Sequence, residues 1–454
     1  MLHRETGALA ARLDYLAAYL DAHPLTPIKV HATPTVEGMS GSILQYGAIT
    51  EGAVVHLRSG LLERIDGYDA GEDLSWQVYT YAADTVEALI TGAVAPPLQF
   101  LQHQTLHADV LGTLFFFLSL ADQYVAPATA LDKHGRVLEA RQLLVRTGRE
   151  RIPVVDRLVV TLFRALGFSL PDHRTALATS HDIDMLRQFR GPLNYLRTSA
   201  RTLLKDRSWK KFAAVQRTVW HMLVHKRPDP FDTFDRLLDG HAFTERRIYF
   251  LVGGTTRFDG YYRPDDPALP PIFEAARAAG YRIGLHPSYD SYQSVGMILA
   301  EKNVLERQIN EPVCISRQHW LRLTIPTTWR ALGECGIEED ASLGYTQRFG
   351  FRAGTGFRFI PYDLGVEAPY SIIVDPLIVM DVALLRAAQH DPTTARNLLA
   401  QFLTRQRNNT RISFNFHNSI FDDTLYGSET MWAIYELGKR AAEEEVGGAA
   451  AGID

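Results

Sequence analysis

Short apolar runs separated by amphipathic stretches dominate the chain from about residue 175 onward. This alternation is typical of an α/β fold with parallel strands. The runs predict strands at 175–180, 247–252, 281–285, 313–316, 372–374 and 411–416. Because active sites of such folds lie at the carboxyl ends of the strands, the polar residues directly after each run are the first candidates for chemistry.

The chain before residue 172 has a different pattern, in which helix-like stretches alternate with short apolar runs. Apolar residues at helical spacing close this part, namely Val155, Leu158, Val159, Leu162 and Leu166. A chain of 454 residues is long enough for two hydrophobic cores. We therefore expect a smaller α/β amino-terminal domain over 1–172, a catalytic domain over 173–442 and a flexible tail over 443–454.

A strongly basic segment covers residues 187–227 and predicts a helical insertion at about 187–240. It holds eleven Lys and Arg residues and a single acid, Asp206. In the interpretation that we favour, its apolar residues form a buried face and the cations point into water. These apolar residues are Leu193, Leu196, Leu203, Leu204, Phe212, Val215, Val219 and Leu223. In the second interpretation, the segment contacts an anionic lipid surface or a lipid-linked glycan, peripheral to the inner face of a membrane.

Composition narrows the class of protein. The formal net charge of -5 and a pI near 6.4 argue against a general nucleic-acid binder, which needs clustered cations. The first twenty residues mix Arg and Glu among apolar residues and do not look like a signal peptide. The most apolar run, at 110–121, is shorter than the roughly 20 residues of a membrane span. We expect a cytoplasmic protein.

Two carboxylates follow the first strand of the catalytic part, in Ser180-His181-Asp182-Ile183-Asp184. In a strand, Asp182 and Asp184 project to the same side. Like charges so close call for a metal ion or an Arg nearby. The alternative is a helix N-cap followed by a surface acid.

Three further clusters follow later strands. In GLHPSYD, a helical continuation after His286 would bring Asp290 to the same face, so that the two could share a metal; a structural His is the alternative. In SRQHWLR, Arg317 could pair with a carboxylate and His319 could be a ligand, or both could belong to a surface ion pair. In NFHNS, His417 could be a general acid or a buried structural His.

Taken in order, TSHDID, GLHPSYDS, SRQHWLR, GIEEDASLGYTQRFGFRAGT and NFHNS resemble the successive motifs of the polysaccharide deacetylase superfamily. The resemblance covers about 175–420 and implies a distorted (β/α) barrel of NodB type. Upstream, FFFLSLADQY and DKHGR resemble the accessory amino-terminal domain of one bacterial branch of this superfamily.

The resemblance also implies roles for individual residues. Asp182 would be the catalytic base, Arg317 the residue that holds this base, and His417 the general acid. Asp184 and His286 would bind one divalent metal ion. Zinc is the first candidate, and cobalt, nickel and manganese are alternatives. The third ligand would be Asp290, which replaces the usual His, or else His319. Tyr289 and Trp320 could form apolar walls for a sugar ring.

The implied activity is metal-assisted hydrolysis that removes an acyl group, most simply acetyl, from a sugar or from a lipid- or nucleotide-linked glycan. Two other functions stay open. One is a glycan-binding or scaffold protein with a weakened metal site, because the second motif is altered. The other is a hydrolase of a small non-sugar amide. The sequence has neither the Gly-x-Ser-x-Gly elbow of serine hydrolases nor a phosphate-binding P-loop.

Overall fold

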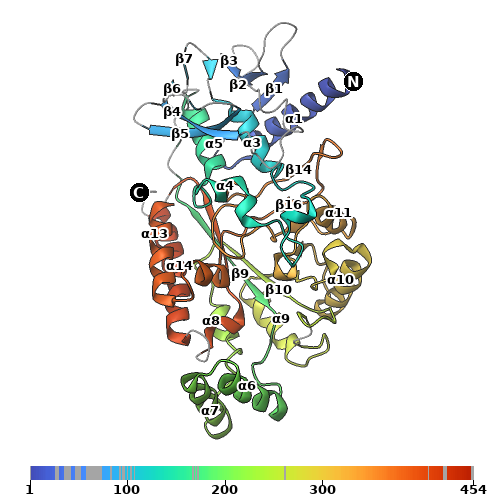
Figure 1. Ribbon diagram of the computed structural model, residues 1–454, viewed down its shortest axis with the longest axis vertical. Helices are drawn as coiled ribbons and strands as arrows, with labels where there is room; N and C mark the ends of the chain where they lie inside the picture. The colour runs from blue at the N-terminus through green and yellow to red at the C-terminus, as the bar shows by residue number, and fades with distance from the viewer. Residues whose placement is uncertain are drawn as a thin grey trace.

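The computed structural model of the chain describes most of its residues. The described residues are 2–25, 30–34, 42–46, 53–57, 74–81, 84–91, 94, 98–99, 101–102, 105–106, 108–165, 168, 170, 173–259, 262–406, 408–422 and 427–450. Figure 1 shows the amino-terminal elements at one end of the molecule, a curved sheet in the middle and a pair of helices, α6 and α7, at the other end.

Eight parallel strands form the central sheet, in the order β16-β13-β12-β11-β10-β9-β18-β17. They are β9 (Ala176–Ile183), β10 (Glu245–Phe250), β11 (Arg282–Leu285), β12 (Ile315–Ser316), β13 (Glu339–Asp340), β16 (Ile373–Val374), β17 (Val379–Met380) and β18 (Arg411–Asn415). A parallel bridge between Gly344 and Leu377 joins the chain after β13 to the chain before β17, so the sheet curls back on itself. The predicted distorted (β/α) barrel is confirmed.

All six predicted strands are present, and two strands of the central sheet, β13 and β17, were missed. The short pair β14 (Tyr362–Asp363) and β15 (Ala368–Pro369), which forms a separate antiparallel ribbon, was missed as well. Both β13 and β17 are two residues long, and β13 consists of two acids, Glu339 and Asp340. Such a short polar run carries no apolar pattern. Both acids are nevertheless buried, because Arg247 pairs with Glu339, and Trp329 and Ser342 donate hydrogen bonds to Asp340.

Helices surround the sheet, with α13 and α14 on one side and α10 and α11 on the other (Figure 1). The helices of this part are α6 (Pro192–Leu204), α7 (Trp209–Val224), α8 (Phe234–Leu237), α9 (Leu269–Ala278), α10 (Val295–Ile309), α11 (Thr327–Glu334), α12 (Asp381–Ala387), α13 (Pro392–Arg405) and α14 (Ser428–Ala450). Helix α14 extends into the segment that was expected to be a flexible tail, and residues 451–454 lie outside the described residues. In the described part of the chain, no helix has both the length and the apolar character of a membrane span.

In the described residues of the amino-terminal part, helices combine with two small sheets, ordered β1-β2-β3-β8-β7 and β5-β4-β6. Its elements are α1 (Leu2–Ala22), β1 (Val30–Pro34), β2 (Ser42–Tyr46), β3 (Ala53–Leu57), β4 (Leu74–Tyr81), β5 (Asp84–Thr91), β6 (Leu98–Gln99), β7 (Leu101–Gln102), β8 (Thr105–Leu106), α3 (Val110–Leu118), α4 (Leu143–Arg146) and α5 (Val154–Ala165). Helix α5 buries Val155, Leu158, Val159 and Leu162, as their helical spacing predicts.

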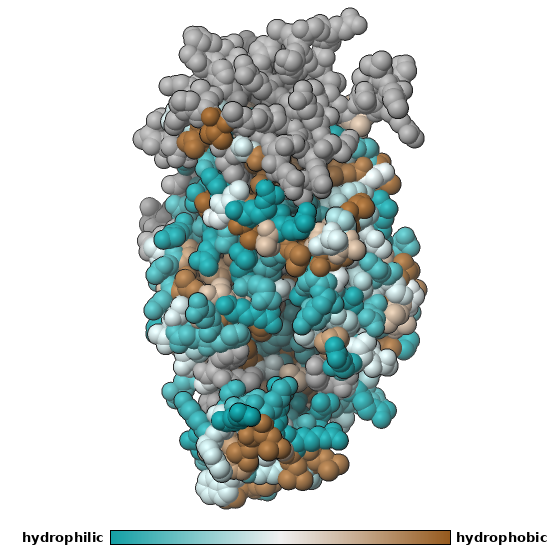
Figure 2. Space-filling model, in the orientation of Figure 1, coloured by the Kyte–Doolittle hydropathy of each residue, from teal (hydrophilic) through white to brown (hydrophobic). Residues whose placement is uncertain are grey.

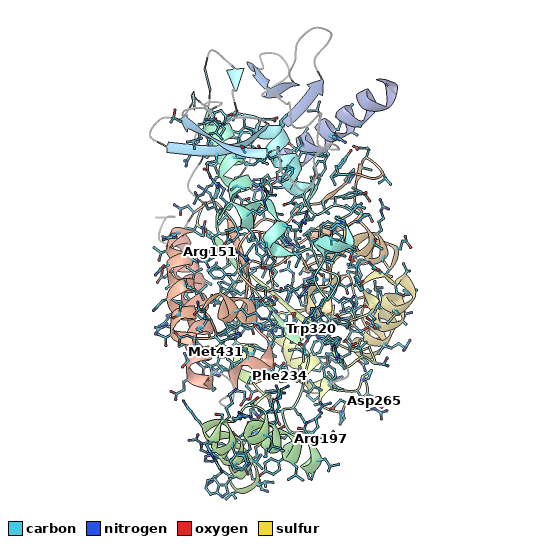
Figure 3. All side chains as sticks on the ribbon, viewed as in Figure 1. Arg151, Arg197, Phe234, Asp265, Trp320 and Met431 are labelled. Atoms are coloured by element: carbon cyan, nitrogen blue, oxygen red, sulfur yellow. The ribbon has the colours of Figure 1, made fainter. Side chains whose placement is uncertain are left out.

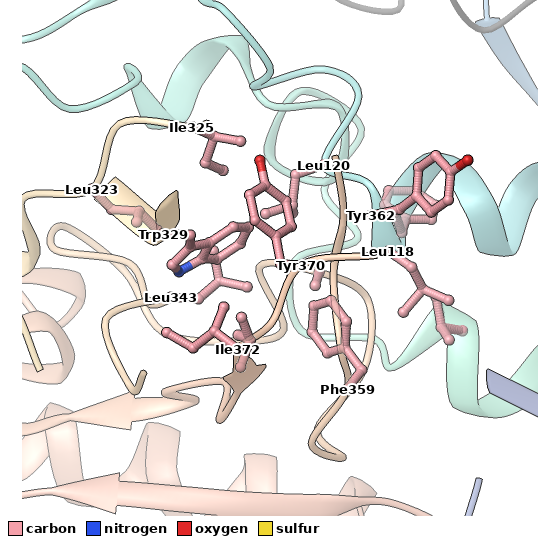
Figure 4. Packing of buried hydrophobic residues seen from close by; sticks show 14 of the residues in the cluster. Leu118, Leu120, Leu323, Ile325, Trp329, Leu343, Phe359, Tyr362, Tyr370 and Ile372 are labelled. Atoms are coloured by element: carbon pink, nitrogen blue, oxygen red, sulfur yellow. The ribbon is translucent and has the colours of Figure 1, made fainter. Parts of the chain in front are cut away.

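One hydrophobic core runs from the amino-terminal helices into the barrel. Leu118 and Leu120 lie in the same packed cluster as Trp329, Tyr362 and Tyr370 (Figure 4). The barrel therefore shares its packing with the residues before 172. The domain boundary at 172 stays a prediction, since β9 starts a new sheet there but the core is continuous.

A buried charge network lies inside the barrel, toward the amino ends of β10, β13 and β18. Arg247 contacts Glu339 at 2.6 Å and Asp375 at 3.4 Å, and Arg411 contacts Asp375 at 2.6 Å and Glu245 at 3.1 Å. Burial by itself would raise the pKa of Asp375, but Arg411 and then Arg247 outweigh burial and lower the pKa to about 2. The network neutralises two arginines whose side chains are almost wholly buried.

Replacing Asp375 with asparagine should destabilise the protein by about 3 kcal/mol, the low end of the range for a broken buried ion pair. Arg411 keeps Glu245 and Arg247 keeps Glu339, but both lose the buried carboxylate that they share. In the wild type, this carboxylate stabilises the fold above its unfolded pKa of about 3.9, and the contribution is lost as the pH falls toward the folded value. Urea unfolding of both proteins between pH 7 and pH 3 measures this. The variant should lose less stability on acidification than the wild type.

Asp265→Asn is the matched control, because Asp265 pairs with Arg263 on the surface, where both side chains are exposed. An exposed pair contributes little, so this change should alter the free energy of unfolding by no more than about 0.5 kcal/mol. Equal effects of the two substitutions would contradict the role given to the buried network.

Candidate active site

The carboxyl end of β9 supplies the first two side chains of the site. Asp182 is buried and Asp184 follows the last residue of the strand. His181 lies on the other face of β9, where its Nδ1 contacts the carbonyl of Phe416 and its ring packs against Tyr281. The alternation along the strand thus brings both carboxylates to the inside of the barrel.

Three side chains from separate strands converge into a candidate metal centre. Asp184, His286 and His319 offer donor atoms that all lie within 4.8 Å of one another. His286 follows β11, and His319 lies in a short 3-10 turn, His319–Leu321, after β12. His286 Nε2 is 3.3 Å from one carboxylate oxygen of Asp184, and His319 Nε2 is 3.8 Å from the other.

The surroundings of the two imidazoles fit a divalent cation. His286 Nδ1 contacts the backbone carbonyl of Arg317, and His319 Nδ1 contacts the carboxylate of Asp259 at 2.9 Å. Metal-binding histidines are held in this manner by a carbonyl or carboxylate at the second nitrogen, which leaves Nε2 for the metal. One oxygen of Asp184 is buried without a hydrogen-bond partner. Such a partnerless oxygen beside two oriented imidazoles suits a cation with nitrogen and oxygen ligands.

Asp184 and His319 shift each other's pKa within this centre. Burial by itself would raise the pKa of Asp184, but the imidazole of His319, followed by that of His286, outweighs burial and holds it well below its ordinary value. Burial would lower the pKa of His319, but Asp184 and Asp259 raise it to about 9. A proton therefore competes with a cation for His319 Nε2.

Asp290 lies apart from this centre. The helical continuation after His286 is wrong: residues 286–288 are irregular, and Pro287 follows His286 directly. Without a helical turn, Asp290 does not return to the face of His286. Its carboxylate accepts a hydrogen bond from Arg322 Nη1 at 3.1 Å and its side chain is 58% exposed. His319, the other residue considered for the third position, stands next to Asp184 instead.

Asp182 is held from two sides. Arg317 Nη1 donates to one of its oxygens at 2.9 Å, and Asn415 Nδ2 donates to the other at 2.9 Å. Arg317 is itself fixed over the ring of Tyr249 and by the carbonyl of Ala341. Burial would raise the pKa of Asp182, but Arg317, followed by two nearby imidazoles, keeps it below its ordinary value. The carboxylate is therefore ionised at neutral pH.

His417 faces the two aspartates from the end of β18. Its Nε2 is 3.8 Å from Asp182 and 3.9 Å from Asp184, and its Nδ1 is 2.9 Å from Asp381, the first residue of α12. Burial would lower the pKa of His417, but Asp381, followed by the two site aspartates, raises it to about 10. The imidazole is thus protonated at neutral pH and points a proton toward the cleft.

A cleft of about 160 Å³ opens over these groups. Trp320 lines it beside Arg136, which donates from Nη1 to the Trp320 carbonyl at 2.8 Å. Trp320 has a φ of 62°, a left-handed conformation that is rare for a bulky residue and is often retained where function needs it. Tyr289 packs against Trp320 and its hydroxyl bonds His134 at 2.7 Å, but it does not line the cleft. Trp320 is labelled in Figure 3.

Sequence reasoning missed three residues that orient the site: Asp259, Asp381 and Asn415. Asp259 and Asp381 lie outside the strands that were predicted, so no pattern marked them. Asn415 did carry a signal, because it lies two residues before His417 in the quoted NFHNS motif. Arg136 also carried one, since it closes the DKHGR segment.

Comparisons with known proteins give similar folds among solved structures. No family model matches the chain, and no curated protein matches its sequence. A candidate polysaccharide deacetylase from Mycobacterium smegmatis is 14% identical, with 60% of this chain and 86% of that chain covered and a TM-score of 0.35. A polysaccharide deacetylase from Bacillus cereus is 10% identical, with 60% and 89% covered and a TM-score of 0.31. A pseudoenzyme of the CE4 family from Bacillus anthracis is 8% identical, with 60% and 67% covered and a TM-score of 0.25.

Proposed function

We propose that the chain is a metal-dependent hydrolase that removes an acyl group, most simply acetyl, from a sugar or polysaccharide precursor. One observation carries the proposal: Asp184, His286 and His319 form a donor set for a cation, and Asp182 and His417 border the same cleft. A divalent cation held by these three residues would polarise the acyl carbonyl and make water more acidic. We propose zinc, which two imidazoles and a carboxylate suit, with cobalt, nickel or manganese as substitutes.

Asp182 acts as the general base. Its low pKa keeps it ionised, and Arg317 and Asn415 fix the carboxylate so that one geometry is presented to the cleft. It accepts a proton from water as the water oxygen forms a bond to the acyl carbon. A positioned base of this kind contributes roughly 10²–10⁴-fold to the rate.

His417 acts as the general acid. As the bond between the acyl carbon and the sugar nitrogen or oxygen breaks, the imidazolium donates its Nε2 proton to the departing atom. The products are a carboxylic acid and a free amine or alcohol, and the proton on Asp182 makes up for the one that His417 gave. Asp381 keeps His417 protonated and oriented, because it binds Nδ1 and leaves Nε2 toward the cleft.

The shape of the cleft supports a small reacting group. Ligand pockets commonly measure about 300–1,000 Å³, whereas this cleft holds about 160 Å³. It suits an acyl group with a single ring against Trp320, and Tyr289 acts behind Trp320 as its packing support. We propose a lipid- or nucleotide-linked glycan as the physiological substrate. The same small volume favours a second candidate, the hydrolysis of a small non-sugar amide.

Acetate release from a panel of acetylated sugars and small amides tests the proposal. The purified protein is treated with a chelator and then assayed alone and with zinc, cobalt, nickel or manganese, and its metal content is measured. We expect about one cation per chain and acetate release from sugars only when the cation is present. Turnover of amides alone would favour the second candidate. A wild-type protein that binds no divalent cation and releases no acetate would favour a glycan-binding or scaffold protein instead.

A further inference from the structure

The two helices α6 and α7 form a hairpin that projects from the barrel at the end opposite the amino-terminal part (Figure 1). The α6–α7 hairpin comprises residues 187–227. At its base, Arg187 pairs with Asp266 at 2.8 Å, and the Asp229 carboxylate accepts from the backbone N–H groups of Gln188 and Phe189. These contacts fix the base of the hairpin to the barrel.

The packing of the hairpin is inverted relative to that of a soluble helix pair. The residues buried in it are small or polar: Ser199 and Thr202 on α6, and Ala214 and Val215 on α7. Most of the large apolar residues point outward, whereas Leu203, Phe212 and Val219 are half-buried. The outward-pointing residues are Leu193, Leu196, Leu204, Trp209, Trp220, Leu223 and Val224, each between 52% and 80% exposed. The buried face favoured from the sequence is thus wrong for Leu193, Leu196, Leu204 and Leu223. Val215 is buried as predicted, and Leu203, Phe212 and Val219 are partly so.

The exposed apolar residues form one stripe on each helix. Leu193 and Leu204 are eleven residues apart, as are Trp209 and Trp220, and eleven residues are about three helical turns, so each pair shares a face. Seven of the fifteen large exposed apolar side chains in the described part of the chain lie here. Figure 2 shows hydrophobic side chains, in brown, gathered at the hairpin end of the molecule, with hydrophilic side chains beside them.

The charge of the hairpin is opposite to that of the rest of the chain. Eleven Lys and Arg residues and one Asp give it a net charge of +10, so the remaining residues carry -15 of the total of -5. The cations flank the apolar stripes, as Arg197, Arg201 and Lys205 do on α6 and Lys210 and Arg217 on α7. They point into solvent.

We propose that the α6–α7 hairpin docks the protein on the surface of an anionic lipid bilayer. Helices with Trp and Leu on one face and Lys and Arg beside it lie in the plane of a membrane interface, with the apolar face among the acyl chains and the cations at the anionic headgroups. Helices of 13 and 16 residues, about 20 and 24 Å long, are too short to cross a core of about 30 Å. Docking needs no activity and does not rest on the proposed function.

Charge complementarity favours an anionic lipid bilayer over a second copy of the chain as the partner of this surface. Two hairpins face to face would bring together two surfaces of charge +10, which repel each other. An anionic bilayer instead neutralises the cations and covers both apolar stripes at once. Small buried residues between the two helices also agree with it, because close packing through Ser, Thr and Ala is typical of helix pairs in lipid.

Co-sedimentation of the full chain with vesicles of phosphatidylcholine, with and without phosphatidylglycerol, tests the proposal. We expect binding to the anionic vesicles that weakens as salt is added. The double variant Trp209→Ser, Leu223→Ser should weaken it at least about tenfold through lost apolar burial. The double variant Arg197→Glu, Lys210→Glu should weaken it similarly through lost attraction. Tryptophan emission should shift to shorter wavelength with vesicles, and less so when Trp209 is replaced.

Two matched controls separate docking from general stickiness. Val366→Ser removes an exposed apolar side chain outside the hairpin, and Arg307→Glu reverses an exposed charge on α10. Both should bind vesicles as the wild type does, and circular dichroism should show that all variants are folded. Equal binding by wild type and hairpin variants, or no binding by the wild type, would overturn the proposal. So would a wild-type dimer that the Trp209→Ser, Leu223→Ser variant dissociates, because the face would then be an interface between copies.

Discussion

Replacing Asp182 with asparagine should lower kcat for acyl hydrolysis by roughly 10³-fold, in the middle of the range for a general base. Asparagine keeps an acceptor oxygen for Arg317, which also retains contacts with Ser180, Asn415 and the Ala341 carbonyl. The side chain loses its ability to take a proton, together with its negative charge and the second oxygen that accepts from Asn415 Nδ2. Because Asp184, His286 and His319 are unchanged, the variant should still bind about one cation per chain.

Steady-state rates and metal content of the Asp182→Asn protein check this expectation, with Asp290→Asn as the control. Asp290 lies on the surface and pairs with Arg322, so its substitution should leave kcat within about twofold. If Asp182→Asn keeps more than a tenth of the wild-type rate, Asp182 is not the base. If it loses the cation as well, the loss of rate says nothing about proton transfer, and Asp182 would have to be counted among the ligands.

Replacing His319 with alanine should weaken cation binding by at least about 100-fold and remove turnover at low metal concentration. Changes to groups that merely orient a ligand already cost about 10–100-fold in affinity, so loss of a ligand should cost no less. Calorimetric titration of the chelator-treated protein with zinc measures the affinity. Addition of a large excess of zinc should restore part of the rate, because Asp184 and His286 remain.

Asp290→Ala decides between the two assignments of the third ligand. With its carboxylate exposed and bound to Arg322, it should titrate with zinc as the wild type does. The opposite pair of results, in which Asp290→Ala loses the cation and His319→Ala keeps it, would require the loop at 286–290 to rearrange on binding and would return the third position to Asp290.

Much of the site could be predicted because its residues follow strands. Asp182, Asp184, His286 and His417 come directly at strand ends, and in a parallel barrel all such ends meet at one mouth. Asp290 could not be placed in this way. Its position depended on an assumed helical turn, and a local pattern of His and Asp four apart says nothing about whether the intervening backbone is helical.

The missed parts share a physical cause, which is that they depend on tertiary neighbours rather than on sequence spacing. Asp381 orients His417 from the start of α12, and Asp259 orients His319 from a loop. The burial of the apolar stripes on the hairpin likewise depends on tertiary neighbours. Periodicity revealed apolar stripes on two helices, but a stripe looks the same whether it faces a protein core or the outside, and here most of it faces out.

The short segment between the site and the hairpin limits the distance between them. Asp184 and Pro192, the first residue of α6, are eight residues apart, so their backbones can be no more than about 30 Å from each other. If the proposed activity and the proposed docking both hold, a hairpin docked on a bilayer would keep the cleft at a fixed height above the membrane. Acyl groups carried at that height would be removed, whereas identical groups nearer to or farther from the membrane would be spared, so that position along a glycan, and not chemistry alone, would decide which are cut.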